Sequence, residues 1–213
     1  MNRPGLFIVL EGPEGSGKST LARALADRMR EGGLDPLIVR EPGGTHAAEV
    51  ARLALLDPEH PVGPLAELFF YLAARADLVQ TLIRPGLAEG RVVLSDRFTL
   101  STEAYQMVGR GLPPEVVVPA NRAAADGLVA DLTLILDVSP EVGQARQVAG
   151  GKRLDRLDQE TVEFRRRVAE YYLAVRGDGV RHLDGRLPPD RLLQAAWSEM
   201  LAVAPERFAA AAS

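Results

Sequence analysis

The sequence predicts an α/β fold in which helices cover both faces of a parallel sheet. Five short runs are almost continuously Val, Ile and Leu, as strands buried on both faces are. Segments with helical spacing lie between these runs, and such alternation is typical of parallel sheets. The chain of 213 residues suits one domain, residues 1–213, because no internal repeat or long linker divides it.

The expected elements follow one another in a regular order along the chain. Strands are expected at residues 6–10, 36–39, 91–95, 132–138 and 180–183. Helices are expected at residues 19–30, 47–56 and 65–83, the last ending before Pro85, and from a cap at Asp158 to about residue 176. Pro119 predicts a kink in the helical segment that follows Pro114. Residues 205–213 are expected to form a flexible tail.

Composition excludes several classes of protein. The formal net charge is −4 and no basic stripe is present, so we expect no nucleic-acid partner. No apolar stretch approaches the roughly 20 residues of a membrane span, and the run at residues 6–10 is too short for the core of a signal peptide. The chain has no cysteine, which fits a reducing compartment. We therefore expect a soluble cytoplasmic protein without a membrane partner.

A glycine-rich loop joins the first expected strand to the first expected helix. It matches G-x-x-x-x-G-K-[ST] and reads Gly12-Pro13-Glu14-Gly15-Ser16-Gly17-Lys18-Ser19-Thr20. The glycines allow backbone N–H groups to turn inward around a phosphate, and the helix N-terminus adds partial positive charge. We expect this loop to bind ATP, with Lys18 at the β- and γ-phosphates and the Ser19 hydroxyl on Mg²⁺.

The loop alone is shared by many nucleotide-binding proteins. Guanine-nucleotide switches need D-x-x-G and N-K-x-D, and the sequence has neither pattern. Motor and remodelling ATPases are usually larger and have an acidic pair after a second strand motif. Neither Ser-Asp-Arg at 95–97 nor Leu-Asp-Val at 136–138 has such a pair. A kinase of small molecules is therefore favoured.

Three further segments narrow the choice. They are Arg-Glu-Pro-Gly-Gly-Thr at 40–45, Asp-Arg-Phe at 96–98 leading to Ser-Thr-Glu-Ala-Tyr-Gln at 101–106, and Asp-Leu-Thr-Leu-Ile-Leu-Asp-Val at 131–138. In this order after the glycine-rich loop, they make the sequence resemble the bacterial thymidylate kinases over about residues 6–200. The resemblance implies a P-loop NTPase fold whose five-stranded sheet has the order 2-3-1-4-5. It also implies transfer of the γ-phosphoryl group of MgATP to dTMP, giving dTDP and ADP for dTTP synthesis, and a homodimer.

The resemblance assigns residues to the phosphate and sugar of dTMP. Arg52 and Arg97 would hold the phosphate, since a guanidinium can give it two parallel hydrogen bonds. Glu14 would accept a hydrogen bond from the 3′-hydroxyl. Arg97 and Lys18 would also act as catalytic residues. The alternatives are surface ion pairs for the arginines and a solvated loop acid for Glu14.

The resemblance also assigns residues to the base. Tyr71 would stack on thymine, with Phe70 as the competing choice, and Arg75 on the same helix face would reach a base carbonyl. Four more residues are assigned to the dTMP site: Glu41, Thr102, Tyr105 and Gln106. Thr102 and Gln106 would bond the base, and Tyr105 would leave no room for a 2′-hydroxyl. For the aromatic residues the alternative is ordinary core packing.

The donor site and a lid complete the resemblance. Asp96 is the candidate to hold Mg²⁺ with Ser19; the alternative is a strand-end acid that caps nearby backbone. Residues 144–157 resemble a mobile lid. Because Gly15 stands where one subclass has an arginine, the lid would supply the catalytic arginine. Arg153 is the first candidate, followed by Arg146 and Arg156. The lid departs from the family in having fewer arginines and an extra Gly-Gly-Lys.

Two other functions stay open at this point. The chain could be a kinase of the same fold that acts on a different small acceptor, because fold alone does not determine a substrate. It could also be a nucleotide-binding regulator that lacks catalysis. Measuring turnover with a panel of acceptors distinguishes both of these functions from phosphorylation of dTMP. His46, His60 and His182 are expected on the surface or in packing.

Overall fold

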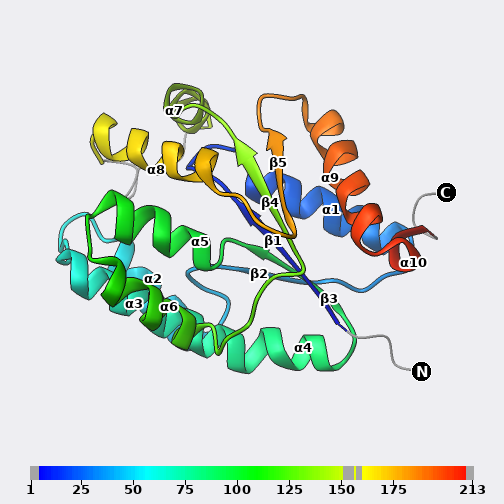
Figure 1. Ribbon diagram of the computed structural model, residues 1–213, viewed down its shortest axis with the longest axis horizontal. Coiled ribbons are helices and arrows are strands. Elements are labelled where there is room, and N and C mark those ends of the chain that lie inside the picture. Colours follow the sequence, from blue (N-terminus) through cyan, green and yellow to red (C-terminus); the bar gives the residue numbers. More distant parts are fainter. Residues whose placement is uncertain (1–4, 151–155, 157–159, 210–213) are drawn as a thin grey trace.

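A five-stranded parallel sheet forms the centre of the computed structural model, which describes residues 5–150, 156 and 160–209 (Figure 1). Its strands are β1 (Leu6–Glu11), β2 (Leu37–Arg40), β3 (Val92–Asp96), β4 (Leu132–Asp137) and β5 (Val180–Asp184). Their order is β2-β3-β1-β4-β5, and every neighbouring pair is parallel. The fold class, the five strands and their order are therefore as predicted.

Helices cover both faces of the sheet. They are α1 (Lys18–Glu31), α2 (His46–Leu56), α3 (Pro64–Leu78), η1 (Val79–Ile83), α4 (Arg84–Ala88), α5 (Thr99–Thr102), η2 (Glu103–Gly109), α6 (Pro114–Ala124), α7 (Pro140–Ala149), α8 (Val162–Ala174), α9 (Pro189–Val203) and α10 (Pro205–Phe208). The segments η1 and η2 are wide π-helical turns. In Figure 1, α1, α9 and α10 lie on one side of the strands, and α2, α3, α4 and α6 lie on the other.

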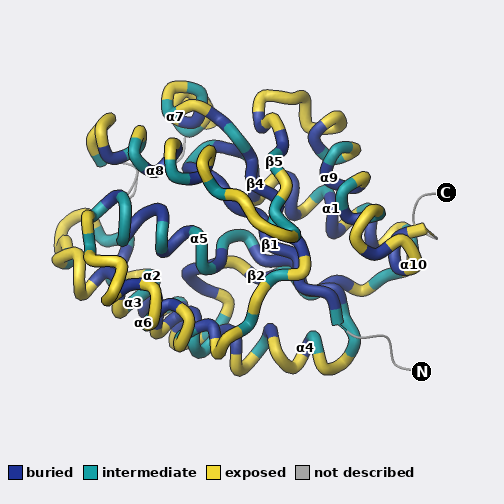
Figure 2. The backbone as a smooth tube through the Cα atoms, viewed as in Figure 1, coloured by how far each residue is buried: buried dark blue, intermediate teal, exposed yellow. Residues whose placement is uncertain are grey.

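The core follows from the alternation of side chains along β1. Leu6, Ile8 and Leu10 face the layer of α1 and α9, whereas Phe7 and Val9 face the layer that contains η1. All five are buried, and the central strands form the continuous buried interior of Figure 2. Burial on both faces explains why the central strands β1, β3 and β4 are nearly all apolar. The buried apolar run stops near the end of each of these strands, and the polar residues of the site begin there.

The expected helix at residues 65–83 extends further than predicted. Its α-helical part is α3, and the chain continues without a break through η1 into α4, so Pro85 does not end it. Proline is tolerated in the first turn of a helix, where its missing N–H is not needed. The π-helical turn η1 precedes α4 and places Pro85 in such a first turn.

Helix α6 includes Pro119, and the kink expected there stays a prediction. Two other expectations differ from the structure. Thr161, and not Asp158, caps α8: its hydroxyl accepts a hydrogen bond from the Phe164 N–H, while Asp158 lies outside the described residues. Part of the expected tail forms α10, where Phe208 is fully buried and its ring lies 5.4 Å from that of Trp197. Within the described ranges, no helix is long and apolar enough to cross a membrane.

Candidate active site

A cavity of about 640 Å³ opens where the strands β1, β2 and β3 end. This volume lies in the range that small-molecule sites usually occupy. The predicted residues that line it are Glu14, Gly15, Gly17, Lys18, Ser19, Thr20, Glu41, Arg52, Tyr71, Arg75, Asp96, Arg97, Thr102, Tyr105, Gln106 and Arg146. The fold thus brings together residues that lie far apart in the sequence, at the carboxyl edge expected for ligands in such sheets.

The glycine-rich loop wraps around the amino group of Lys18. The Lys18 Nζ donates hydrogen bonds to the carbonyl oxygens of Gly12 and Pro13, both at 2.8 Å, and to Ser16 Oγ at 3.2 Å. Burial, aided by the positive charge of Arg97, lowers the pKa of Lys18 to about 8. The amino group is therefore held at the loop in a partly desolvated state, where an anion would stabilise its charged form.

Close packing between the loop and α7 explains one of the glycines. Gly15 has φ +72°, and a Cβ there would lie 2.1 Å from the carbonyl oxygen of Gly143. An arginine at this position would therefore need α7 to move away. Arg146, one turn further along α7, donates from Nη1 to the Gly185 carbonyl at 2.7 Å. Three segments therefore meet at one end of the cavity: the glycine-rich loop, α7, and the first residue of the loop that follows β5.

Ser19 and Asp96 meet at the edge of the cavity. The Ser19 hydroxyl donates to Asp96 Oδ2 at 2.5 Å, and both side chains line the cavity. A hydroxyl and a carboxylate are oxygen ligands of the kind that Mg²⁺ prefers, and Mg²⁺ commonly uses one or two protein ligands together with phosphates and water. No cluster of three or more metal-ligating side chains occurs in the described part of the chain. The pair fits Mg²⁺ that arrives with a nucleotide.

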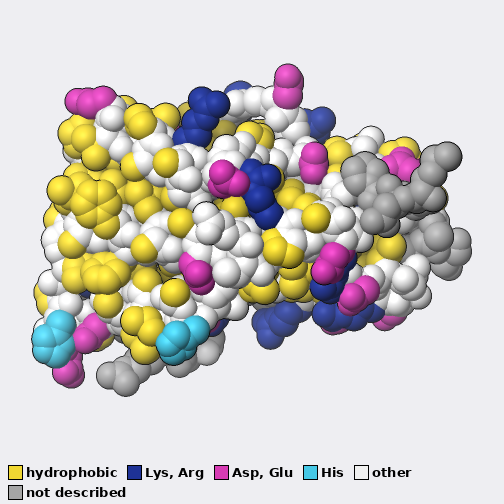
Figure 3. All heavy atoms as spheres, turned by 90° about the horizontal axis from the view of Figure 1, so that it is seen from below, with side chains coloured by type: hydrophobic (Ala, Val, Ile, Leu, Met, Phe, Trp, Pro, Cys, Tyr) yellow, Lys and Arg dark blue, Asp and Glu magenta, His cyan; other side chains and the backbone are white. Residues whose placement is uncertain are grey.

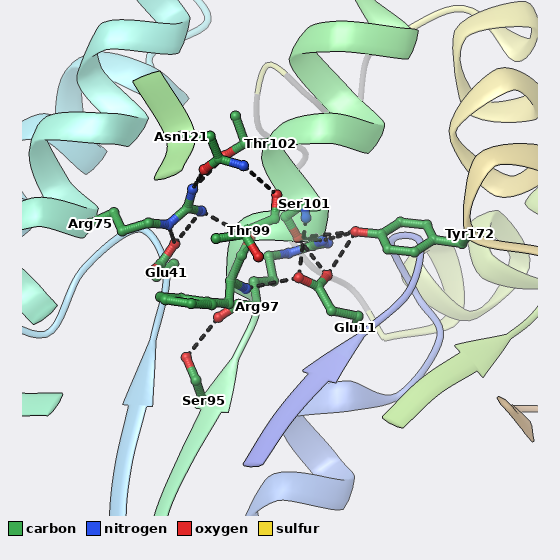
Figure 4. Close-up of polar contacts among 11 residues, drawn as sticks. Glu11, Glu41, Arg75, Ser95, Arg97, Thr99, Ser101, Thr102, Asn121 and Tyr172 are labelled. Atoms are coloured by element: carbon green, nitrogen blue, oxygen red, sulfur yellow. Dashed lines mark hydrogen bonds and ion pairs between the residues drawn. The ribbon is translucent and has the colours of Figure 1, made fainter. Parts of the chain in front are cut away.

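Arg97 projects into the cavity from a strained turn after β3. Its φ is 79°, a left-handed value that non-glycine residues rarely adopt. From Nη2 it donates to Glu14 Oε1 at 2.6 Å and to the Tyr105 hydroxyl at 3.2 Å, and from Nη1 to Ser101 Oγ at 3.0 Å. The guanidinium is thus bonded to the glycine-rich loop through Glu14, and Figure 4 shows it pointing toward Ser101 and Tyr172 on its other side.

Glu11, the last residue of β1, holds this turn in place. Its carboxylate is fully buried and accepts hydrogen bonds from the backbone N–H groups of Phe98 and Ser101 at 2.9 and 3.1 Å. It also accepts from the hydroxyls of Ser101 at 2.7 Å and Tyr172 at 2.8 Å (Figure 4). Sequence reasoning missed this role. The available signal was a charged residue at the end of a strand that is otherwise apolar.

Arg75 is fully engaged by protein groups. Its Nε and Nη2 donate to Glu41 Oε2 at 2.8 and 2.5 Å, Nη2 also donates to the Phe98 carbonyl at 2.9 Å, and Nη1 donates to Thr102 Oγ1 at 2.8 Å and to Asn121 Oδ1 (Figure 4). Burial raises the pKa of Glu41 against the opposing charge of Arg75. Glu41 Oε1 is buried without a hydrogen-bond partner among the described residues. To donate to a base carbonyl as expected, Arg75 would therefore have to share or give up one of these hydrogen bonds.

The two aromatic candidates on α3 separate clearly. Tyr71 lines the cavity, and burial raises the pKa of its hydroxyl. Phe70 instead packs against Ala48, Ala51 and Ala74, between α2 and α3. The structure therefore favours Tyr71 over the alternative Phe70, and the contact with the base stays a prediction. Successive helical residues point about 100° apart, so only one of the two can face the cavity.

Two of the three candidate lid arginines are described. Arg146 lies on α7 beside the glycine-rich loop, as above. Arg156 donates from Nε to the Leu55 carbonyl at 3.0 Å and from Nη2 to Glu67 Oε2, so it bonds to α2 and α3 rather than lining the cavity. Arg153 lies outside the described residues. Of the expected lid at 144–157, residues 144–149 belong to α7.

The cavity also has lining residues to which the sequence analysis assigned no individual role. Arg23 and Arg40 contribute two further positive charges, and Gln147 and Gly150 extend the wall formed by α7. Glu67 lies behind the wall, fully buried, and bonds Gln106. Arginine is so common in this sequence that Arg23 carried no distinguishing signal, and Arg40 was noted only as the first residue of the segment at 40–45.

Comparison with known proteins assigns the chain to a family. The family model described as thymidylate kinase matches residues 10–192. Relatives named thymidylate kinase occur in Ectopseudomonas mendocina (52% identical over 79% of this chain and 80% of that protein) and Halothermothrix orenii (48% over 79% and 82%). Another occurs in Thermomicrobium roseum (44% over 92% of this chain and 95% of that protein). A match over most of its length, together with the cavity at its strand ends, shows that the chain belongs to the thymidylate kinase family.

Proposed function

We propose that the protein transfers the γ-phosphoryl group of MgATP to dTMP, giving dTDP and ADP. One observation carries this proposal: a single cavity holds both the phosphate-binding loop with Lys18 and a second cationic group, Arg97 with Arg52. Two phosphorylated ligands can therefore meet end to end, one on the loop and one on the guanidiniums. The names of the relatives support dTMP as the acceptor.

The chemistry requires positioning and charge neutralisation more than a nucleophilic side chain. An oxygen of the acceptor phosphate attacks the γ-phosphorus, and the bond to the β,γ-bridging oxygen breaks as ADP leaves. The attacking oxygen is already an anion, so no general base is needed. Lys18 neutralises the developing charge on the donor, and Arg97 aligns the acceptor. Ser19 and Asp96 would hold Mg²⁺, which supplies further neutralisation of the phosphate charge.

Other side chains of the cavity would set the choice of acceptor. Tyr71 would supply the ring on which the base stacks, and Arg52, whose Nη1 donates to the Pro42 carbonyl at 2.9 Å, would hold the acceptor phosphate. The Tyr105 hydroxyl lies close to Arg97, where it would crowd the 2′ side of a sugar. Glu14 is bonded to Arg97 and would accept from the 3′-hydroxyl. The arginine that closes on the transferred group stays a prediction, with Arg153 as the first candidate and Arg146 and Arg156 after it.

A panel of acceptors tests this function. ADP release is measured with saturating MgATP and dTMP, dUMP, dCMP, AMP or shikimate. We expect dTMP to have the highest kcat/KM and dUMP to follow it, because a lost methyl contact costs only about 1–3 kcal/mol. Highest turnover on any other acceptor contradicts the proposal. Tight ATP binding without dTMP-dependent ADP release supports the non-catalytic alternative.

The same proposal includes a homodimer. Large apolar side chains are exposed on three helices that pack side by side: Val50 and Leu53 on α2, Leu65 and Phe69 on α3, and Val116 and Val118 on α6. In Figure 3, hydrophobic side chains gather on the left of the molecule, the side that carries these helices in Figure 1. Contiguous exposed apolar surface supports a protein interface there. The cytoplasmic location stays a prediction from the sequence.

A further inference from the structure

Two neutral side chains at the acceptor end of the cavity are bonded to buried charged groups. Thr102 Oγ1 accepts from Arg75 Nη1 at 2.8 Å, and Gln106 Nε2 donates to Glu67 Oε1 at 2.7 Å. All four side chains are nearly inaccessible to solvent, and Thr102 and Gln106 line the cavity. The charged groups therefore decide which hydrogen-bonding atoms the two neutral groups offer to a ligand.

Glu67 sets the orientation of the Gln106 amide. A carboxylate only accepts hydrogen bonds, so the amide must turn its NH₂ group toward Glu67. The carbonyl oxygen of Gln106 is then the atom that can receive a hydrogen bond from a ligand. Rotating the amide by 180° would place two acceptors against each other in a buried site and leave both without a hydrogen bond, which is strongly unfavourable.

Two arginines keep Glu67 ionised. Arg110 donates to Glu67 Oε1 from Nε at 3.1 Å and to Oε2 from Nη2 at 2.9 Å, and Arg156 also donates to Oε2. Burial by itself raises the pKa of Glu67, but the hydrogen bonds from Arg110, Gln106 and Arg156 outweigh burial and hold the pKa below its ordinary value. Glu67 therefore acts as a permanent acceptor.

Arg75 sets the orientation of the Thr102 hydroxyl. A guanidinium only donates, so the hydroxyl oxygen accepts from it and the single O–H proton stays available for a ligand. Each of the five N–H groups of Arg75 already has an acceptor on Glu41, Thr102, Asn121 or Phe98 (Figure 4). The donor that the Arg75–Thr102 pair has left for a ligand is therefore the threonine hydroxyl.

We propose that Glu67 is a positioning residue for base recognition, which with Arg75 makes Gln106 an acceptor and Thr102 a donor toward the base. This proposal rests on the proposed function and deepens it. A donor beside an acceptor complements the O4 and N3–H of thymine or uracil. Cytosine has the opposite pattern, an amino group at C4 and an unprotonated N3, so it would leave both protein groups mispaired. Glu67 does not touch the base; it selects keto pyrimidines through Gln106.

The test compares kcat/KM for dTMP, dUMP and dCMP in the wild type and in Glu67→Gln. The new amide can donate as well as accept, so it tolerates both orientations of Gln106. We expect kcat/KM to fall for dTMP and dUMP alike, mainly through KM, and to fall little for dCMP. The dTMP/dCMP ratio should drop about tenfold or more, since polar mismatches dominate such discrimination. An equal loss for all three acceptors would mean that Glu67 is merely structural and overturns the proposal.

Two further variants complete the experiment. Glu163→Gln makes the same chemical change at an exposed glutamate paired with Arg166 on α8, and its dTMP/dCMP ratio should equal that of the wild type. Glu67→Asp keeps the charge that Arg110 and Arg156 face but shortens the side chain, so it replaces Glu67→Gln should that variant fail to fold. It should lower the ratio too, and an unchanged ratio overturns the proposal.

The same data separate this inference from the proposed function. A wild type that does not prefer dTMP and dUMP over dCMP contradicts the function itself. A wild type with that preference, combined with an unchanged ratio in the folded Glu67 variants, contradicts only the role of Glu67.

Discussion

The amino group of Lys18 links nucleotide binding to pH. Burial, with the nearby charge of Arg97, lowers its pKa to about 8, so the amino group loses its proton as the pH rises through that value. A bound triphosphate stabilises the charged form and raises the pKa again, so binding takes up a proton between the two pKa values. Calorimetry with a non-hydrolysable ATP analogue, in buffers of different ionisation enthalpy, should show uptake approaching one proton near pH 9 and little below about pH 7.

The same residue should govern how affinity changes with pH. Above the pKa of the free protein, the affinity for the ATP analogue should fall by up to about tenfold per pH unit, because the proton must be supplied. Lys18→Met removes the titrating group and should abolish both effects. Absence of proton uptake by the wild type near pH 9 would contradict the lowered pKa.

Arg97 should affect the acceptor far more than the donor. Arg97→Ala removes a guanidinium that can give charge-assisted bonds to the acceptor phosphate, so kcat/KM for dTMP should fall at least about a hundredfold. The KM for ATP should change little, since Lys18 and the loop amides stay in place. Arg166→Ala, at an exposed arginine on α8, is the control. Unaltered dTMP kinetics in Arg97→Ala would show that the acceptor phosphate lies elsewhere.

Sequence reasoning located the residues that follow local rules and missed their buried partners. The loop around Lys18 has a spacing imposed by phosphate binding, so a short pattern reveals it. Glu67 and Gln106 are 39 residues apart, and their bond exists only because α3 and η2 pack together. Phe70 and Tyr71 are neighbours on one helix, and only the packing of α2 against α3 decides which ring faces the cavity.

At the scale of elements, the contact between α7 and the glycine-rich loop allows no side chain at Gly143. A Cβ there would lie 2.3 Å from the carbonyl oxygen of Glu14, so Gly143→Ala must push α7 away from the loop. We expect the affinity for an ATP analogue to fall about tenfold, with dTMP binding less affected. Gly63→Ala is the matched control, because its Cβ would meet no described atom within 4 Å. Equal ATP affinity in the two variants would show that α7 moves without cost to the site.

Strands were easier to predict than the ends of helices. The three central strands, β1, β3 and β4, are almost wholly buried, and that burial leaves a continuous apolar run in the sequence. The ends that were missed depend on context outside the segment. The π-helical turn before Pro85 changes the hydrogen-bond pattern, so the proline does not stop the helix. The last turn, α10, forms because Phe208 packs on Trp197 and Arg207 bonds the Gly90 carbonyl at 2.8 Å.

At the scale of the whole molecule, the exposed apolar side chains of α2, α3 and α6 should form the contact between two copies. Leu53 is 74% exposed and Phe69 is 55% exposed, and each would place a large apolar surface in water if the chain were alone. Burying such a side chain contributes about 1.5–3 kcal/mol, so several from each copy can hold a dimer.

A charge on this surface should dissociate the dimer. For the chain of 23.0 kDa, light scattering after gel filtration should give about twice this mass for the wild type and the single mass for Leu53→Asp with Phe69→Asp. An aspartate there would have to lose its hydration without a partner, which costs more than the apolar contact contributed. Leu173→Asp, at a half-exposed leucine on α8 away from these helices, should stay dimeric. If the wild type is monomeric at micromolar concentration, this apolar surface does not bind a second copy of the chain.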